Sequence, residues 1–249
     1  MNREGEHSNG IGQVSVIMLR TKASCAFFLI SMFLLSVQSP MLLADTEISE
    51  TSGRAQTTWS GSVVLNNHYT IPVTDELVIS PCTNVTMSNG VRIYVEGRIT
   101  VEGTSTCPVY FDYSGGGDHM GIQFNSSSNG RGSKIDNASI IHATYGITVY
   151  GSDPYLANVT IWNPDDVGVD LFNSATPIIR NLVIDEAGQD WNFPNYWRYG
   201  IGLSIGAGSA PNIDGLSVND AVTRGLNVWG ISGGLIRNCL LYTSPSPRD

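Results

Sequence analysis

The stretch "GITVYGSDPYLANVTI", residues 146–161, decides the fold of this chain. Apolar and polar residues alternate in its first five positions and again in its last four, with a short Gly-Ser-Asp-Pro turn between the two halves. Alternation with period two places Ile147 and Val149 on one face of a strand and Thr148 on the other. The stretch therefore predicts two short β-strands joined by a tight turn.

The first half of this unit recurs along the chain. Five segments begin with glycine and alternate in the same way, and their starts lie 25, 22, 32 and 25 residues apart. They are GIQFN (121–125), GITVY (146–150), GVDLF (168–172), GIGLS (200–204) and GLNVW (225–229). If the starts are aligned, the outward column consists of Gln123, Thr148, Asp170, Gly202 and Asn227. A recurring strand at one coil length is typical of a solenoid.

The second half recurs as well. The segments KIDNASII, YLANVTI, IIRNLVI, NIDGLSV and LIRN follow the glycine-led segments in turn. One position in each is asparagine or glycine: Asn137, Asn158, Asn181, Gly215 and Asn238. Because both residue types tolerate a positive φ, this column predicts a repeated left-handed turn, and its asparagines are placed to bond to one another along the stack.

No window shows a sustained helical period, so we expect an all-β chain. The repeat resembles that of right-handed parallel β-helix proteins, the secreted pectin-lyase-like group, with roughly 22–25 residues per coil. The resemblance covers residues 59–238, is carried by the repeat alone, and brings no catalytic signature. Residues 45–58 are expected to be a linker. A β-sandwich is the main alternative, but it does not predict turns aligned at one coil length.

Both ends of the chain look different from the repeats. Residues 23–37 are apolar or small and follow Arg20 and Lys22, so residues 1–44 are expected to be a signal peptide. A retained anchor is the alternative, and the part before Met18 is expected to be either leader or over-read sequence. Residues 239–249 ("CLLYTSPSPRD") resemble a translated sequencing adapter. A natural tail is the alternative. If these residues come from an adapter, we expect the coils of the protein to continue past Asn238 and the solenoid to be truncated here.

The charge composition of the chain excludes some classes of binding partner. Lys and Arg number 13 against 22 Asp and Glu, a net charge of −9. This balance argues against nucleic acid and, beyond the signal segment, against a membrane surface. An exported chain with cysteines at 82 and 107, one coil apart, is expected to form a disulfide between them; a free buried pair is the alternative. Four Asn-x-Ser/Thr triplets, at Asn84, Asn125, Asn137 and Asn158, fit an exported chain.

Only one acidic group is a candidate for chemistry. Asp165 and Asp166 lie in a turn just before Asp170, the one carboxylate of the outward column. Three carboxylates can bind Ca²⁺ or supply a general acid and base. Against catalysis, the neighbouring outward positions, Thr148 and Gly202, cannot complete a pair of carboxylates. Asp-Asp is also common in ordinary turns.

Other catalytic groups are not evident in the sequence. The signatures of polygalacturonase-like enzymes are missing, and Arg180, Arg198 and Arg224 are expected elsewhere on neighbouring coils. The histidines at 68, 119 and 142 have no metal-ligand spacing. We therefore expect no cofactor apart from the Ca²⁺ alternative.

The coil between Gly168 and Gly200 is seven to ten residues longer than its neighbours. The extra residues are expected at about 188–199, in the sequence GQDWNFPNYWRYG (188–200). Insertions in solenoids form loops on one face, often the binding face. The candidate ligand-binding residues are Asp190, Trp191, Phe193, Tyr196, Trp197, Arg198 and Tyr199. The alternative is that these rings fold back as a small core.

The sequence therefore favours an exported or cell-surface β-helix protein that acts as a binding or adhesion module, toward glycans or a surface protein. A polysaccharide lyase or glycoside hydrolase acting on acidic glycans is the second hypothesis, with Asp165, Asp166 and Asp170 as its residues. A structural spacer in a larger surface protein is the third. Enzymatic activity is left open, although the residues of the outward column argue against it more than for it.

Overall fold

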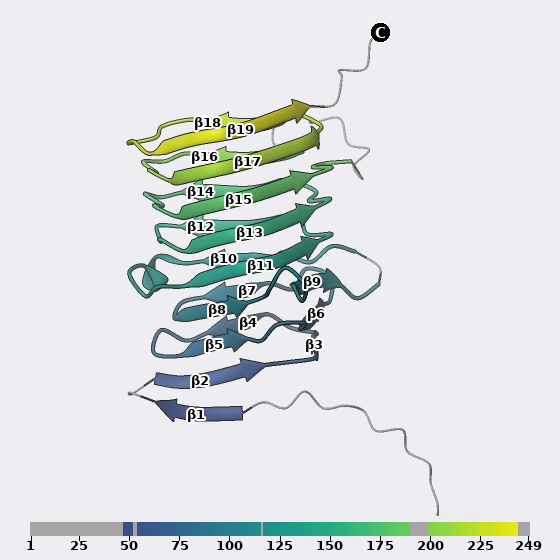
Figure 1. Cartoon of the computed structure of the whole chain (residues 1–249), viewed down its shortest axis with the longest axis vertical. Helices are drawn as coiled ribbons and strands as arrows, with labels where there is room; N and C mark the ends of the chain where they lie inside the picture. Colours follow the sequence, from purple (N-terminus) through teal and green to yellow (C-terminus); the bar gives the residue numbers. More distant parts are fainter. Residues whose placement is uncertain (1–46, 52–53, 116, 190–198, 244–249) are drawn as a thin grey trace, which may run out of the picture. The chain divides into compact units, whose positions relative to one another are not determined.

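A computed structural model describes residues 47–51, 54–115, 117–189 and 199–243 of the chain. The expected signal peptide (residues 1–44) lies outside the described residues, as do residues 190–198 of the aromatic insertion and residues 244–249 of the tail. The described residues form a stack of β-coils (Figure 1). The only helical element among them is a short 3₁₀ turn, η1 (Ser126–Ser128). The all-β parallel solenoid predicted from the repeat is confirmed.

One side of the stack is a seven-stranded sheet in which all neighbouring strands are parallel. Its strands follow the chain from one coil to the next: β4 (Tyr69–Ile71), β7 (Ile93–Val95), β10 (Ile122–Phe124), β12 (Tyr145–Tyr150), β14 (Val167–Phe172), β16 (Ile201–Ile205) and β18 (Arg224–Val228). These include the glycine-led segments of the sequence.

The second sheet has twelve strands and covers the rest of each coil. Its first column contains β1 (Glu47–Thr51), β2 (Arg54–Trp59), β5 (Glu76–Ile79) and β8 (Arg98–Glu102), and its second contains β3 (Ser62–Leu65), β6 (Asn84–Met87) and β9 (Val109–Tyr113). Both columns continue into the long strands β11 (Lys134–Ile141), β13 (Tyr155–Trp162), β15 (Ile178–Asp185), β17 (Asn212–Ala221) and β19 (Leu235–Thr243).

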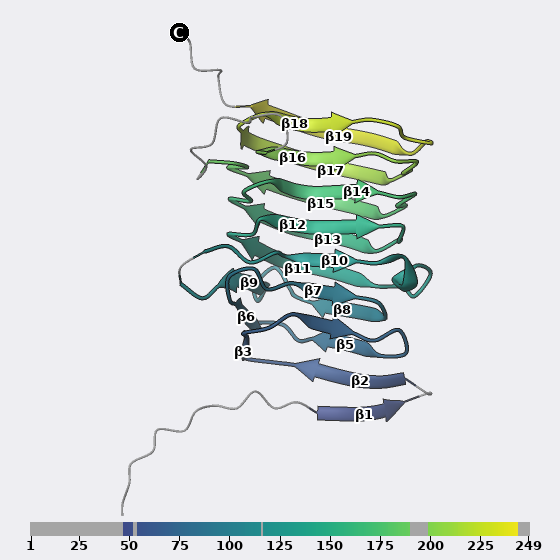
Figure 2. The same ribbon diagram turned by 180° about the vertical axis from the view of Figure 1, so that it is seen from behind.

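The two columns merge at β11, where residues 134–136 pair with β8 and residues 138–140 pair with β9. Asn137 lies between these two pairings with φ +49°. Each long strand is therefore bent into two limbs, and a coil has three faces: the seven-stranded sheet and the two limbs of the second sheet. We call the limb built on β3, β6 and β9 the third face (Figure 2).

The predicted column of left-handed turns is confirmed. Positive φ occurs at each aligned position: Asn137 (+49°), Asn158 (+51°), Asn181 (+51°), Gly215 (+83°) and Asn238 (+55°). The asparagine amides also bond along the stack, since Asn181 donates to Asn158 Oδ1 at 3.1 Å and Asn158 donates to Asp136 Oδ1 at 3.0 Å. The asparagine column thus shapes the bend and joins consecutive coils.

Inward-pointing side chains stack directly on one another to form the core. In the seven-stranded sheet Ile122, Ile147 and Val169 pair in register, and all are at most 1% exposed. Matching stacks of Ile, Leu and Val come from the second sheet. Because strands in a sheet lie about 4.8 Å apart, each side chain packs against its equivalents in the coils on either side.

The register of one coil differs from the sequence alignment by two residues. Leu203 and Ile205, rather than Ile201 and Leu203, pair with Val169 and Leu171. Ser204 therefore takes the place predicted for Gly202 in the outward column, next to Asp170. The sequence GIGLSI contains glycines at both 200 and 202, and a shift of two residues keeps the same side chains inward, so alternation alone does not distinguish the two registers.

A column of glycines fixes this register. A Cβ on Gly146 would lie 2.5 Å from the Gly168 carbonyl oxygen, and one on Gly168 would lie 2.7 Å from that of Gly202. At Gly202 a Cβ would lie 2.6 Å from the Gly225 oxygen and 2.4 Å from Val218 Cγ1. These positions have no room for a side chain, so the glycine that belongs in the column is Gly202, not Gly200.

We predict that Gly202→Ala lowers the free energy of unfolding by about 1–3 kcal/mol, because the added methyl group overpacks the sheet-to-sheet contact. Gly225→Ala is the matched control from the same column, since its nearest contact is an ordinary 3.5 Å to Leu241 Cβ. Urea unfolding of both variants measures the difference. Equal destabilisation by the two substitutions would contradict the assigned register.

The parallel sheet begins earlier than expected. β2 (Arg54–Trp59) occupies most of the second half of the predicted linker at residues 45–58 and pairs in parallel with β5. β1 pairs with β2 in antiparallel fashion. β2 carries no glycine-led signature, so the repeat pattern gave no sign of it.

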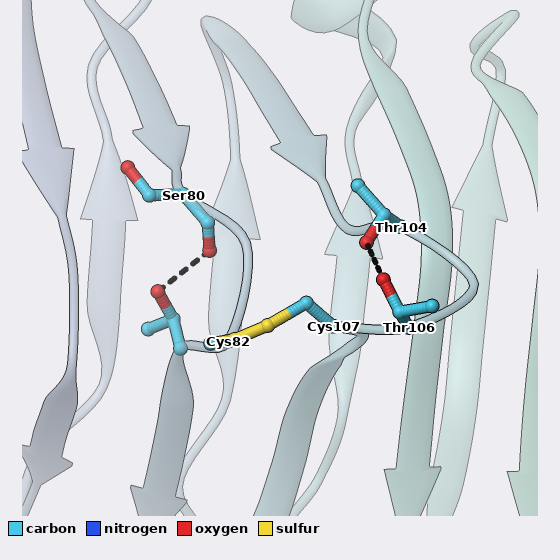
Figure 3. The surroundings of a disulfide bond; sticks show 6 residues. Ser80, Cys82, Thr104, Thr106 and Cys107 are labelled. Carbon is cyan, nitrogen blue, oxygen red and sulfur yellow. Dashed lines mark hydrogen bonds between the residues drawn. A yellow bond between two sulfur atoms is a disulfide. The ribbon is translucent and has the colours of Figure 1, made fainter.

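Cys82 and Cys107 are joined by a disulfide, with 4.7 Å between their Cα atoms (Figure 3). Cys82 lies just before β6 and Cys107 just before β9, which are adjacent parallel strands. The bond therefore joins neighbouring coils where the chain enters the third face. Cys82 also has φ +61°, so it occupies a left-handed corner without being asparagine or glycine.

His119 is completely buried just before β10. Its Nδ1 accepts from the Gly121 amide at 3.0 Å, so the neutral ring carries its proton on Nε2, 3.0 Å from the Ile141 carbonyl oxygen. Burial is the main cause that lowers the pKa of His119 to about 4. The sequence, in which His119 only lacks metal-ligand spacing to another histidine, did not predict this burial.

This burial predicts an acid-sensitive fold. The unfolded imidazole titrates near its ordinary pKa of 6.5 and the folded one near 4, so the unfolded chain binds more protons between these values. The neutral His119 therefore contributes to the free energy of unfolding in full above pH 6.5. This contribution, about 3 kcal/mol at most, is lost as the pH falls toward 4.

Urea unfolding at pH 7 and pH 4.5 tests this prediction. The wild type should lose about 2–3 kcal/mol more stability on acidification than His119→Gln, which does not titrate. His68→Gln, at an exposed histidine, is the control and should behave like the wild type. If His119→Gln loses as much stability as the wild type, then His119 is not responsible for the acid sensitivity.

Candidate functional site

The outer face of the seven-stranded sheet carries a polar pocket with a volume of about 570 Å³. Its lining combines carboxylates, one guanidinium, small polar groups and aromatic rings from several coils. The lining residues are Tyr145, Asp166, Val167, Asp170, Tyr199, Ile201, Ser204, Arg224, Asn227 and Trp229.

Register explains how these residues come together. Thr148, Asp170, Ser204 and Asn227 form one outward column on β12, β14, β16 and β18. Tyr145, Val167, Ile201 and Arg224 form a second column on the same strands, three residues earlier in each. Most of the lining belongs to these two columns, so the pocket is a product of stacking and spans four coils.

Trp229 gives the pocket an exposed aromatic surface. It is 55% exposed and follows β18 directly, and its backbone amide donates to the Ile205 carbonyl at 2.8 Å. A Cβ on Gly206 would lie 2.3 Å from Trp229 Cε2, so the indole rests on a backbone that has no side chain. The ring is thereby held in place beside the polar columns.

Tyr145 connects the pocket with Arg92 on the preceding coils. The Arg92 guanidinium lies 5.5 Å from the centre of the Tyr145 ring and 5.9 Å from that of Tyr94. Arg92 also donates to Gln123 Oε1 at 2.6 Å and to the Met120 carbonyl at 2.9 Å. Burial is the main cause that lowers its pKa, but a guanidinium remains charged at neutral pH. The polar, aromatic surface therefore continues beyond the pocket toward the N-terminal coils.

The predicted group of three acidic residues is only partly brought together. Asp165 and Asp166 are both buried, but Asp166 lines the pocket together with Asp170, whereas Asp165 does not line it. The backbone of this turn is held by both neighbouring coils: Asp165 N donates to Ala143, and Asp165 O accepts from Gly200. Among the described residues no group of three or more His, Cys, Asp or Glu side chains that could hold a metal ion is found.

The insertion leaves the coil and returns to it beside the pocket. Gly188 N donates to Pro164 O and Gly200 N to Asp165 O, so two consecutive residues of the preceding coil bracket the whole insertion. Of the predicted ligand-binding residues, Tyr199 is described and lines the pocket. Asp190, Trp191, Phe193, Tyr196, Trp197 and Arg198 lie outside the described residues.

Sequence reasoning missed several lining residues. Arg224 was expected away from the acidic group, yet it lines the same pocket as Asp166 and Asp170. Ser204 was missed because of the two-residue register error, and Trp229 and Tyr145 were not singled out. The glycine column was the available signal, since aligning Gly202 with Gly225 brings Ser204 and Asn227 together.

Comparison with known proteins gives one positive result. A family model described as "Right handed beta helix region" matches residues 61–241, most of the chain. No curated protein and no solved structure gives a significant match. Within the part of the chain that the structure describes, no helix is long and apolar enough to cross a membrane.

Proposed function

Because the chain belongs to the right-handed β-helix family, we propose that it is an exported surface or secreted protein that uses its β-helix as a binding module for glycans. The observation that carries this proposal is the pocket on the seven-stranded sheet, whose lining combines the exposed Trp229 with Asp170, Asn227 and Arg224. Flat rings pack against the apolar faces of sugars, while carboxylate, amide and guanidinium groups bond to hydroxyl groups.

The shape of the surface supports an extended ligand. The two outward columns run along the stack, and the Tyr145 ring joins the pocket to Arg92 and Tyr94. A ligand lying along the columns meets an equivalent position in each coil, about every 4.8 Å. An oligosaccharide suits such a surface better than a compact small molecule does.

A glycan-cleaving enzyme is the second candidate. The observation that favours it is the presence of Asp166, Asp170 and Arg224 in one pocket. A carboxylate can act as a general base, and a guanidinium can stabilise negative charge that develops in a transition state. The spacer hypothesis does not account for these groups on an outer face.

We predict that Trp229→Ala weakens glycan binding about tenfold, the effect of losing roughly 1.4 kcal/mol of ring contact. Trp162→Ala is the matched control, because Trp162 is an exposed tryptophan on the third face. A glycan array identifies the ligand, and calorimetry with that oligosaccharide measures the affinity of each variant. Equal losses in the two variants would remove the pocket from the proposal.

The same oligosaccharide separates binding from cleavage. Incubation with the wild type, followed by a reducing-end assay, should show no new chain ends if the protein is a binding module. New ends that disappear in Asp170→Asn would establish the enzyme instead. If the wild type gives no signal on the glycan array, both the binding module and the glycan-cleaving enzyme are contradicted, and the structural spacer is favoured.

A further inference from the structure

The structure distinguishes the four Asn-x-Ser/Thr triplets of the sequence. In Asn137 the side-chain amide donates twice, to the Gly103 carbonyl at 3.2 Å and to Asp136 Oδ1 at 2.9 Å. Both of its amide hydrogens are therefore in use. Attachment of a sugar to this nitrogen would break one of these bonds at the corner of the coil.

Asn125 and Asn158 are held by bonds on both sides. Asn125 donates to Glu96 and accepts from Gln123 Nε2 at 2.7 Å. Asn158 donates to Asp136 at 3.0 Å and accepts from Asn181 at 3.1 Å. Each of these side chains bridges neighbouring coils, so a sugar would have to fit around a fixed amide.

Asn84 has a different environment. It is exposed at the start of β6 and points outward on the third face. Within the described residues its side chain forms no hydrogen bond. Tyr110 of β9 is its register partner on one side and Ser62 of β3 on the other. Its amide can therefore carry a substituent without loss of any contact seen in the fold.

A hollow of about 380 Å³ lies directly beside this amide. It is lined by Asn84, Val85, Thr86, Tyr110, Asp112 and Ile141. Tyr110 is 39% exposed, and Val64, the register partner of Thr86, is 61% exposed. The hollow thus offers the ring of Tyr110 and the partly buried side chain of Ile141 together with the carboxylate of Asp112, a combination suited to one sugar ring.

We propose that Asn84 is an N-glycosylation site and that the first sugar of its glycan rests on Tyr110. The donor is an oligosaccharide linked to a lipid diphosphate, met during export. Asn84 Nδ2 forms a bond to C1 of the first sugar while the C1–O bond to the diphosphate breaks. The lipid diphosphate leaves with the electron pair, and the transferase takes the proton from Nδ2. Thr86 supplies the hydroxyl that completes the triplet.

The consequence for the folded protein is protection of the third face. A glycan at Asn84 would cover the exposed parts of Tyr110 and Val64 at an edge where β3 is the last strand of its column. Uncovered edge strands are prone to pair with other chains, and a bulky polar group next to the edge prevents this. Glycosylation at Asn84 rests on the proposed export of the chain but not on the pocket at Asp170, which lies on a different face.

Occupancy is measured by secreting the chain from cells that have an oligosaccharyltransferase. Peptide-N-glycosidase leaves an aspartate at each occupied asparagine, and peptide mass spectrometry then reads all four triplets. Asn84 should be the most occupied and Asn137 the least. Thr86→Ser should retain the glycan, whereas Thr86→Ala should lose it. Asn84→Gln, a substitution at an exposed position, should lose it as well. An unmodified Asn84 in the folded, secreted wild type, or equal occupancy at Asn137, would overturn the proposal.

The contact with Tyr110 has its own test. Enzymatic removal of the glycan from the folded wild type should lower the melting temperature by about 2–4 °C. In Tyr110→Ala, which keeps the triplet and therefore the glycan, removal should lower it by less than half as much. The same decrease in both proteins would show that the sugar does not rest on Tyr110.

Discussion

Each coil of this solenoid must place its inward side chains directly over those of the coil before it. Parallel strands of successive coils lie about 4.8 Å apart and are joined by backbone hydrogen bonds, so a coil that closes too early or too late loses both its core contacts and these bonds. The left-handed corner at Asn137 and its equivalents meets this requirement by bending every long strand at the same place. The glycines at 146, 168 and 202 meet it where no side chain fits.

The candidate site follows from the same constraint. Since the stacking fixes the core columns, only outward positions and corners are free to vary, and the pocket is built from two outward columns. The insertion leaves and returns at a corner, between Gly188 and Gly200, where the coil is closed by Pro164 and Asp165 of the preceding turn. A long segment is therefore accommodated without disturbing the strands on either side of it.

Features with a local chemical cause could be predicted from the sequence. The strands follow from alternation, the corners from asparagine and glycine, and the insertion from its length. Features that depend on register could not, because GIGLSI satisfies alternation in two ways and the choice between Gly200 and Gly202 rests on contacts with Val218 and Gly225. The place of Arg224 in the same pocket as Asp170, and the burial of His119 after a glycine-rich segment, are likewise known only once the coils are stacked.

We propose the outer face of the seven-stranded sheet as the functional surface. A crystal structure with the oligosaccharide that gives the strongest array signal tests this most directly. We expect sugar rings along the two outward columns, with one ring against Trp229 and polar contacts to Asp170 or Asn227. Density for the ligand on the third face, or on the asparagine corners, with the pocket unoccupied would contradict it.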